Sequence, residues 1–245
     1  MDGMNNTTQQ LSVVIPCLNE ASRLPLLLAD LQRCAPGAEI LLADGGSSDA
    51  TPQVAGQSGA RLIKIHPPGR GRQLRAAANQ ARGDWLLFLH ADSRLPLRWS
   101  SAVRSLLKTS AAAASAWYFD LRISPSTPAR RLLERGVGLR SSWLQRPYGD
   151  QGLLLHRELY ARCGGFAELP LMEDLDLVER LSRIADLKRI GLPLTTDGRR
   201  WQDDGVLRRS WRNARLRRRW KQGESAERLA EDYYGTQFAY QKPQR

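Results

Sequence analysis

One short stretch is the most informative part of the chain, Gly83-Asp84-Trp85-Leu86-Leu87-Phe88-Leu89-His90-Ala91-Asp92-Ser93-Arg94-Leu95-Pro96. Residues 85–89 form a short apolar run, which is typical of a strand buried on both faces of a parallel sheet. Directly after this run the chain becomes polar with His90 and Asp92. Ligands of open α/β sheets bind just beyond the carboxyl ends of the strands. On this stretch alone, Asp92 can hold a divalent cation against nucleotide phosphates, or it can cap a helix that begins near Leu97.

Length and composition indicate a folded protein with a sizeable core, since 42% of the 245 residues are hydrophobic and 25% are charged. The three cysteines are far apart and predict neither a disulfide framework nor a zinc site. Residues 1–10 are polar, lack the pattern of a signal peptide and are expected to be disordered. No apolar run is long enough to span a bilayer, so we expect a cytoplasmic protein, free or on the inner membrane face.

The net charge of +12 is concentrated near the carboxyl end of the chain. Residues 199–221 hold ten basic side chains against two aspartates. A charge of this size calls for an anionic partner, which could be membrane lipid, nucleic acid or a phosphorylated substrate.

Strands and helices alternate through the first part of the chain. This alternation predicts a parallel, doubly wound α/β sheet. After Pro96 the alternation weakens, and we divide the chain into a nucleotide-binding half (11–96), an acceptor half (97–200) and a basic helical extension (201–245). The expected strands cover 11–15, 39–43, 61–65, 85–89 and 114–122, and the expected helices cover 21–33, 49–58, 73–82, 98–108, 128–140, 206–221 and 225–234.

Three loops that follow successive strands each carry an acidic side chain: Pro16 to Glu20, Asp44 to Asp49, and His90 to Ser93. Parallel strands bring these loops to one edge of the sheet. A single carboxylate there would usually cap a helix, whereas three on one edge favour a binding site. None of the loops has the glycine spacing of a dinucleotide fingerprint or a P-loop.

These motifs, in this order, resemble those of the family-two glycosyltransferases of the GT-A fold. The residues that carry the resemblance are Val13-Val14-Ile15-Pro16-Cys17-Leu18-Asn19-Glu20, Asp44-Gly45-Gly46-Ser47-Ser48-Asp49 and the stretch from Gly83 to Asp92. The His90-Ala91-Asp92 form, with Tyr148-Gly149-Asp150-Gln151 later, is similar to a bacterial subgroup of small single-domain members. The resemblance implies a Rossmann-like, mostly parallel sheet flanked by helices, followed by a C-terminal helical extension.

The resemblance also implies a nucleotide-sugar pocket. Asp44 would bind the uracil or ribose, and Asp92 would coordinate Mn²⁺ or Mg²⁺ that bridges the diphosphate. His90 stands where the family usually has a second aspartate; imidazole can ligate Mn²⁺, whereas Mg²⁺ prefers oxygen. The implied metal ligands are therefore Asp92 and His90. The implied nucleotide-sugar-binding residues are Pro16, Asn19, Glu20, Asp44, Gly46, Arg70, Arg72, Ala91, Asp92, Asp150 and Gln151.

Two of these assignments have structural alternatives that the sequence leaves open. Arg70 and Arg72 can clasp phosphate oxygens through charge-assisted hydrogen bonds, or they can belong to a solvated loop. Asp150 and Gln151 can bind sugar hydroxyls, or they can belong to a surface turn.

The pair Glu173-Asp174 fits the first turn of a helix, where the helix dipole favours acidic side chains. The resemblance implies that Asp174 deprotonates the acceptor hydroxyl, with Glu173 as the second candidate, and that a single displacement inverts the anomeric centre. The structural alternative is that both acids only cap the helix.

Residues 206–221 are basic almost all round, with tryptophan and leucine interleaved. This pattern suits a helix on anionic lipid, a nucleic-acid contact, or a helix packed on the domain with its arginines in water. We favour peripheral membrane contact because family members often act on lipid-linked acceptors, and we disfavour nucleic acid.

The function expected from the sequence is a metal-dependent, inverting glycosyltransferase. It would move a sugar from a UDP-, GDP- or dTDP-sugar to a hydroxyl acceptor, with a lipid-linked acceptor as one candidate. A sugar nucleotidyltransferase is the nearest alternative, but its glycine- and lysine-rich signature is replaced here by Cys17-Leu18-Asn19-Glu20. The other alternative is a non-catalytic protein that keeps the nucleotide-binding fold and uses its basic tail on membrane or nucleic acid.

Overall fold

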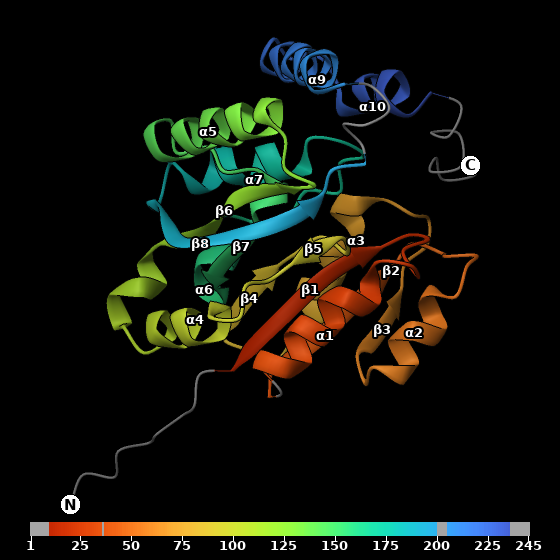
Figure 1. Ribbon diagram of the computed structural model, residues 1–245, viewed down its shortest axis with the longest axis vertical. Helices are drawn as coiled ribbons and strands as arrows, with labels where there is room; N and C mark the ends of the chain where they lie inside the picture. Colours follow the sequence, from red (N-terminus) through yellow and green to blue (C-terminus); the bar gives the residue numbers. More distant parts are fainter. Residues whose placement is uncertain (1–9, 36, 200–204, 236–245) are drawn as a thin grey trace, which may run out of the picture.

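The computed structural model describes residues 10–35, 37–199 and 205–235 (Figure 1). The segment predicted to be disordered, residues 1–10, lies outside the described residues except for Gln10. The predicted boundary at residues 200 and 201 also lies outside them.

The strands of the described chain form one mixed sheet in the order β3-β2-β1-β4-β7-β6-β8-β5. The first four strands in this order are parallel to one another. Strand β7 is antiparallel to its two neighbours, β4 and β6. Strand β8 is parallel to β6, and β5 is antiparallel to β8. The predicted parallel sheet is thus confirmed for the amino-terminal half. The strands are β1 (Leu11–Cys17), β2 (Glu39–Asp44), β3 (Arg61–Lys64), β4 (Trp85–Phe88), β5 (Ser93–Arg94), β6 (Ala116–Ser124), β7 (Leu153–His156) and β8 (Leu187–Asp197).

Helices cover both faces of the sheet because successive strand residues point to opposite sides. Val13 of β1 packs in the core that contains α1, α2 and α4, while Val14 packs in the core that contains α3, α6 and α7. The helices are α1 (Leu24–Cys34), α2 (Thr51–Gln57), α3 (Arg70–Gln80), α4 (Trp99–Leu107), α5 (Pro128–Trp143), α6 (Arg157–Arg162), α7 (Glu173–Leu181), α9 (Val206–Lys221) and α10 (Ala226–Tyr234).

Strand β1 continues two residues beyond its predicted end at Ile15, through Pro16 to Cys17. It stays paired with β2 as far as Cys17, but its pairing with β4 ends at Val14, whose carbonyl accepts from Leu89. Proline has no N–H to donate, so it can end one ladder without ending the other. The chain therefore leaves β4 here, at the edge where the predicted ligand loops gather.

Helix α3 begins at Arg70, three residues before the predicted start at Gln73. Arg70 and Arg72, which the prediction left outside this helix, therefore lie in its first turn. Strands β5, β7 and β8 were not predicted: β5 has two residues and β7 four, and β8 contains Gly191 and Pro193.

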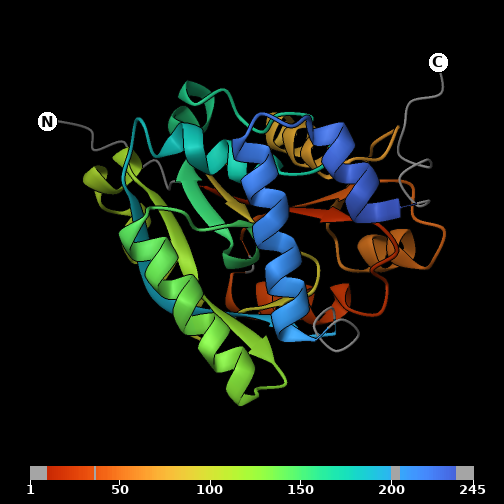
Figure 2. The same cartoon turned by 90° about the horizontal axis from the view of Figure 1, so that it is seen from above.

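The carboxyl-terminal helices α9 and α10 lie over the edge of the sheet, beside α5 and α7 (Figures 1 and 2). The predicted bounds of α9 are confirmed. Its Leu216 is 5% exposed and packs with Met172, Leu175 and Leu229 in a small separate core. Of the helices that the structure describes, not one combines the length and the apolar character needed to cross a bilayer.

Candidate active site

A cleft lies beyond the carboxyl ends of β1 and β4. One part, the loop pocket, has a volume of about 210 Å³ and is lined by the loops after these strands and by the start of α3. The other part, the helix pocket, has a volume of about 230 Å³ and is lined by residues from α5, α7, α9 and α10. Arg70, His90, Asp92 and Tyr234 line both parts, so the two pockets form one continuous cleft.

The loops after β1 and β2 are tied together by hydrogen bonds. The side-chain oxygen of Asn19 accepts from the backbone N–H groups of Ser48 and Asp49, at 2.8 and 3.3 Å. Asn19 has a φ of 56°, a left-handed conformation that asparagine tolerates better than most residues. In return, its own N–H donates to Ser47. Asn19 thus fixes the shape of this edge, and its predicted contact with the nucleotide stays a prediction.

Asp44 lies at the end of β2, paired in register with Cys17. It is 2% exposed, and its carboxylate accepts from the backbone N–H and the hydroxyl of Ser47. The predicted residues that line the loop pocket are Pro16, Glu20, Arg70, Ala91 and Asp92, together with His90.

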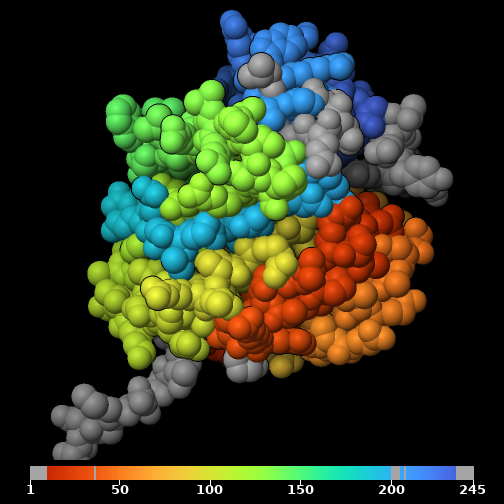
Figure 3. All heavy atoms as spheres, viewed as in Figure 1, coloured from red at the N-terminus to blue at the C-terminus, as the bar shows by residue number. Residues whose placement is uncertain are grey.

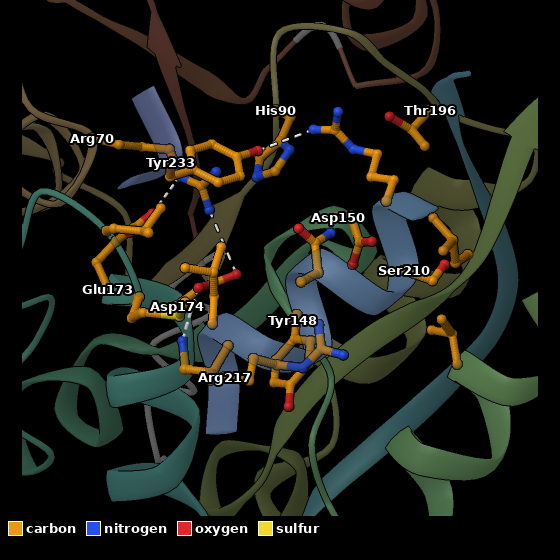
Figure 4. A pocket seen from close by; sticks show the side chains of 18 of the residues that line it. Arg70, His90, Tyr148, Asp150, Glu173, Asp174, Thr196, Ser210, Arg217 and Tyr233 are labelled. Carbon is orange, nitrogen blue, oxygen red and sulfur yellow. Dashed lines mark hydrogen bonds and ion pairs between the residues drawn. The ribbon is translucent and has the colours of Figure 1, made fainter. Parts of the chain in front are cut away.

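Side chains from three distant segments converge on Gly149. A methyl group added to its Cα would lie 2.8 Å from Arg70 Nη2, 3.0 Å from His90 Nε2 and 3.1 Å from Asp174 Oδ2. The backbone N–H of Gly149 also donates to Asp174 Oδ2, at 3.0 Å. The start of α3, the loop after β4 and the start of α7 therefore meet at Gly149, where only glycine leaves room for the three side chains. Figure 4 labels Arg70, His90 and Asp174 in this pocket.

Glu173 and Asp174 occupy different environments although they are adjacent in sequence. The side chain of Glu173 is 3% exposed and forms an ion pair with Arg70, and burial raises its pKa while Arg70 opposes this shift. The side chain of Asp174 is 21% exposed and lies 3.5 Å from Arg70 Nη2. Figure 4 shows Arg70 between the two carboxylates. Asp174 is therefore the more exposed of the two acids, and the buried Glu173 is paired with Arg70.

The predicted metal ligands His90 and Asp92 both line the shared part of the cleft. No group of three or more histidine, cysteine, aspartate or glutamate side chains able to hold a metal occurs among the described residues. Mg²⁺ in nucleotide sites is commonly held by one or two protein carboxylates together with substrate phosphates. The donor set here therefore fits a cation that is shared with a diphosphate, and it does not fit a cation bound by the protein alone.

Asp150 and Arg140 lie in the helix pocket, and each has a buried atom without a hydrogen-bond partner in the described structure, Asp150 Oδ1 and Arg140 Nη2. Burial raises the pKa of Asp150, although the nearby Arg140 opposes this shift. A ligand hydroxyl could accept from Arg140 and donate to Asp150, because a hydroxyl has both capacities. This pair fits a hydroxyl-bearing ligand.

Two other predicted residues are engaged away from the cleft. Gln151 is 1% exposed; its amide donates to the carbonyl of Phe119 and accepts from the hydroxyl of Ser141. Arg72 donates to Glu168 and to the carbonyl of Pro67. Of the two arginines proposed for phosphate, Arg70 is the one that lines the cleft.

Several lining residues were not predicted, because they come from helices whose packing the sequence does not reveal. Arg140 projects from α5 and stacks on Tyr148, with the guanidinium carbon 4.0 Å from the ring centre. Arg217 of α9 approaches the same ring at 5.5 Å. Arg209 of α9 donates to the hydroxyl of Tyr233 of α10. The basic run was the available signal, but it gave no indication of which arginines face the domain.

Comparison with protein families and with characterised sequences agrees with this architecture. The family model for glycosyl transferase family 2 matches residues 12–167. A 4,4'-diaponeurosporenoate glycosyltransferase of Staphylococcus haemolyticus is 32% identical over 96 residues, which are 36% of this chain and 26% of that protein. A PGL/p-HBAD biosynthesis glycosyltransferase of Mycobacterium bovis is 38% identical over 91 residues, 34% of this chain and 36% of that protein. The matched segments thus span about a quarter to a third of these relatives.

Solved structures share the fold at low sequence identity. S. aureus TarS 1-349 has a TM-score of 0.65 and 15% identity, with 77% of this chain and 60% of that chain covered. Glucosyl-3-phosphoglycerate synthase from Mycobacterium tuberculosis, in complex with Mn²⁺, uridine-diphosphate and phosphoglyceric acid, has a TM-score of 0.55 and 20% identity, with 76% and 70% covered. The fold is therefore GT-A, as the sequence predicted.

Proposed function

The chain belongs to glycosyl transferase family 2, and from this premise we propose that it transfers a sugar from a nucleotide-diphosphate sugar to an acceptor hydroxyl with inversion. The observation that carries the proposal is the meeting of Arg70, His90 and Asp174 around Gly149. A reaction between two substrates needs groups that both substrates can reach. Arg70 and His90 line both the loop pocket and the helix pocket, and Asp174 lines the helix pocket.

In the proposed reaction the donor lies in the loop pocket and the acceptor in the helix pocket. The carboxylate of Asp174 accepts the proton of the acceptor hydroxyl as the oxygen bonds to the anomeric carbon. The bond between that carbon and the diphosphate breaks in the same step, and the diphosphate leaves with its electron pair. Arg70 stabilises the charge that develops on the diphosphate. A single displacement of this kind inverts the anomeric centre.

We propose His90 and Asp92 as the protein ligands of Mn²⁺ or Mg²⁺ on the donor diphosphate. When bound, such a cation neutralises charge on the leaving group. Mn²⁺ accepts an imidazole ligand more readily than Mg²⁺ does, so we expect Mn²⁺ to be preferred. Two fold neighbours with Mn²⁺ and uridine-diphosphate in their structures support testing UDP-sugars first.

The acceptor side is proposed from the buried pair Arg140 and Asp150, which fits a hydroxyl. We also propose a lipid-linked acceptor and a peripheral membrane contact through α9, at the cytoplasmic face. Seven arginines and a lysine among the described side chains of this helix support attraction to anionic lipid, although two of the arginines line the cleft.

The test is nucleotide diphosphate release from UDP-, GDP- and dTDP-sugars, with and without Mn²⁺, by the wild-type protein and by Asp174→Asn. Wild-type protein should release the diphosphate with acceptor present. Asp174→Asn should bind the donor with unchanged affinity in a thermal-shift titration, but its kcat should fall by about 10²- to 10⁴-fold because the base is lost.

Asp176→Asn is the matched control, because Asp176 belongs to the same turn but pairs with Arg180. It should keep wild-type kcat. Equal transfer by Asp174→Asn and wild type would exclude Asp174 as the base. Donor binding without transfer in any combination would instead favour the non-catalytic alternative, and pyrophosphate release from a nucleoside triphosphate and a sugar phosphate would favour a nucleotidyltransferase.

A further inference from the structure

Helix α5 carries an exposed apolar stripe. Leu132, Leu139 and Trp143 are 69%, 56% and 81% exposed, and the following Leu144 is 62% exposed. Leu132, Leu139 and Trp143 are seven and four residues apart, which puts them on one face of a helix. That face is opposite to Val137 and Ser141, which pack toward the sheet. A soluble domain gains nothing by holding large apolar groups in water, so this face calls for a partner.

Helix α9 presents a matching outer face of aromatic and basic side chains. Trp211 is 65% exposed, and Arg208, Arg215 and Arg218 are exposed beside it. On α5 the stripe is likewise flanked by exposed Arg131 and Arg135. Neither helix has an exposed acidic side chain, because α9 contains none and Glu134 of α5 is 8% exposed and paired with Arg122.

The two outer faces lie on the same side of the molecule. Figure 2, which is seen from above, shows α5 and α9 side by side with their lengths in view, and the space-filling view shows both in the upper part of the molecule (Figure 3). On each helix the exposed residues lie opposite the side that packs on the domain. We call the exposed apolar and basic side chains of α5 and α9 together the roof face.

We propose that the roof face docks on an anionic lipid bilayer, with the α5 stripe inserted among the acyl chains and the arginines on the headgroups. Leucine and tryptophan supply apolar and interfacial anchoring, and arginines beside them reach phosphate while their stems remain in apolar surroundings. The acidic side chains that would repel an anionic surface are missing from the exposed parts of both helices. The chemistry of the face therefore matches a bilayer with negative headgroups.

Two other occupants fit the roof face less well. A symmetric dimer through this face would bring the arginines of two copies together, which costs free energy. A nucleic acid would satisfy the arginines through its phosphates, but it would leave the exposed leucines in water.

The proposed membrane docking does not require sugar transfer. Only its consequence for the acceptor rests on the proposed function. Arg140 of α5 and Arg217 of α9 line the helix pocket, on the sides of these helices that face the domain. Docking by the opposite sides would hold the pocket next to the headgroups, where the hydroxyl of a lipid-anchored acceptor lies. The sequence alone suggested contact through residues 206–221, whereas the structure adds the apolar half of the surface, on α5.

The experiment is co-sedimentation of the full chain with vesicles of phosphatidylcholine containing about 30 mol% phosphatidylglycerol, at low salt. The variant Leu132→Asp/Leu139→Asp should weaken partitioning at least tenfold. Its matched control is Leu26→Asp/Leu97→Asp, which changes two leucines of similar exposure, 52% and 65%, outside the roof face and should partition like wild type.

A second pair of variants tests the arginines. Arg215→Gln/Arg218→Gln should weaken partitioning about fivefold for each arginine, while the exposed pair Arg104→Gln/Arg162→Gln should change it little.

Each result has a defined meaning. If the α5 variant and its control partition equally into vesicles, the proposal is overturned, even if the arginine variant loses binding. The apolar stripe would then contribute nothing to vesicle binding. Loss of a dimer by the α5 variant in size-exclusion chromatography with light scattering would overturn it in favour of a second copy. If wild-type protein transfers sugar but does not bind the vesicles, membrane docking is refuted and the proposed function is not. If it binds the vesicles but transfers no sugar, the proposed function is refuted and membrane docking is not.

Discussion

The two sides of the cleft are built in different ways. On the loop side, Asn19 accepts hydrogen bonds from the neighbouring loop, and Asp44 accepts from Ser47, so these polar groups are satisfied without a ligand. On the helix side, Arg140 Nη2 and Asp150 Oδ1 are buried and lack hydrogen-bond partners in the described structure. An unsatisfied buried group costs free energy, so the helix side has the most to gain from a substrate. This difference supports the proposed assignment of the preformed loop side to the donor and of the helix side, which a ligand would complete, to the acceptor.

The largest expected effect on stability is at the ion pair between Arg70 and Glu173, where the two sides join. Arg70→Met would leave the buried Glu173 carboxylate without its partner and should lower the free energy of unfolding by about 3 kcal/mol in urea titrations. Arg72→Met is the control, because its partner Glu168 is 51% exposed and a surface pair contributes about 0.5 kcal/mol. The double variant Arg70→Met/Glu173→Met should recover most of the loss. A double variant as unstable as Arg70→Met would argue against the ion pair as the cause.

A smaller effect is expected from Asp150→Asn on the helix side. The acceptor KM should rise about tenfold, because one hydrogen bond to a charged group is weakened, while the donor KM stays unchanged.

The pH dependence of stability should change as well in Asp150→Asn. Burial raises the folded-state pKa of Asp150 above its ordinary value of 3.8, so the folded protein binds more protons and loses stability as the pH rises through this range. In Asp150→Asn, the free energy of unfolding should lack this decrease when it is measured between acid and neutral pH. An unchanged slope would show that Asp150 is not the group responsible.

The smallest expected effect is from Asn19→Gly on the loop side. Glycine keeps the left-handed backbone but removes the side-chain oxygen, so only the hydrogen bonds to Ser48 and Asp49 are lost. The free energy of unfolding should fall by about 1 kcal/mol, and the donor should bind a few-fold more weakly. The acceptor KM should not change. A change in the acceptor KM, with donor binding intact, would reverse the assignment of the two sides.

The same contrast explains how far the sequence could predict this molecule. Strands β1 to β4 and the helices between them follow from continuous apolar runs and regular helical spacing, and the loops at their ends could be placed at one edge. Arg70 was expected near phosphate, but its partner Glu173 lies about a hundred residues away in sequence, and local pattern cannot reveal such a pair.

The helix side was less predictable for a physical reason. The basic pattern of α9 gave its bounds, but arginines on nearly every side concealed the face that packs on the domain. Only Leu216 is buried among the residues of that helix whose side chains are described. Tyr233, Arg209 and Arg217 gave no signal of a shared pocket, because their proximity depends on how α9 and α10 fold back over the sheet edge.

The central claim is that donor and acceptor chemistry meet at Gly149, and the variant Gly149→Ala tests it most directly. The added methyl would push against the ends of three flexible side chains, so the fold should survive. These groups must shift by at least a few tenths of an ångström, which should lower kcat by about tenfold or more, because transfer depends on their positions. The control is Gly138→Ala in α5, where a methyl meets nothing within 4 Å. Transfer by Gly149→Ala should fall as stated while its thermal unfolding stays close to that of Gly138→Ala, and equal transfer rates for the two variants would contradict the account.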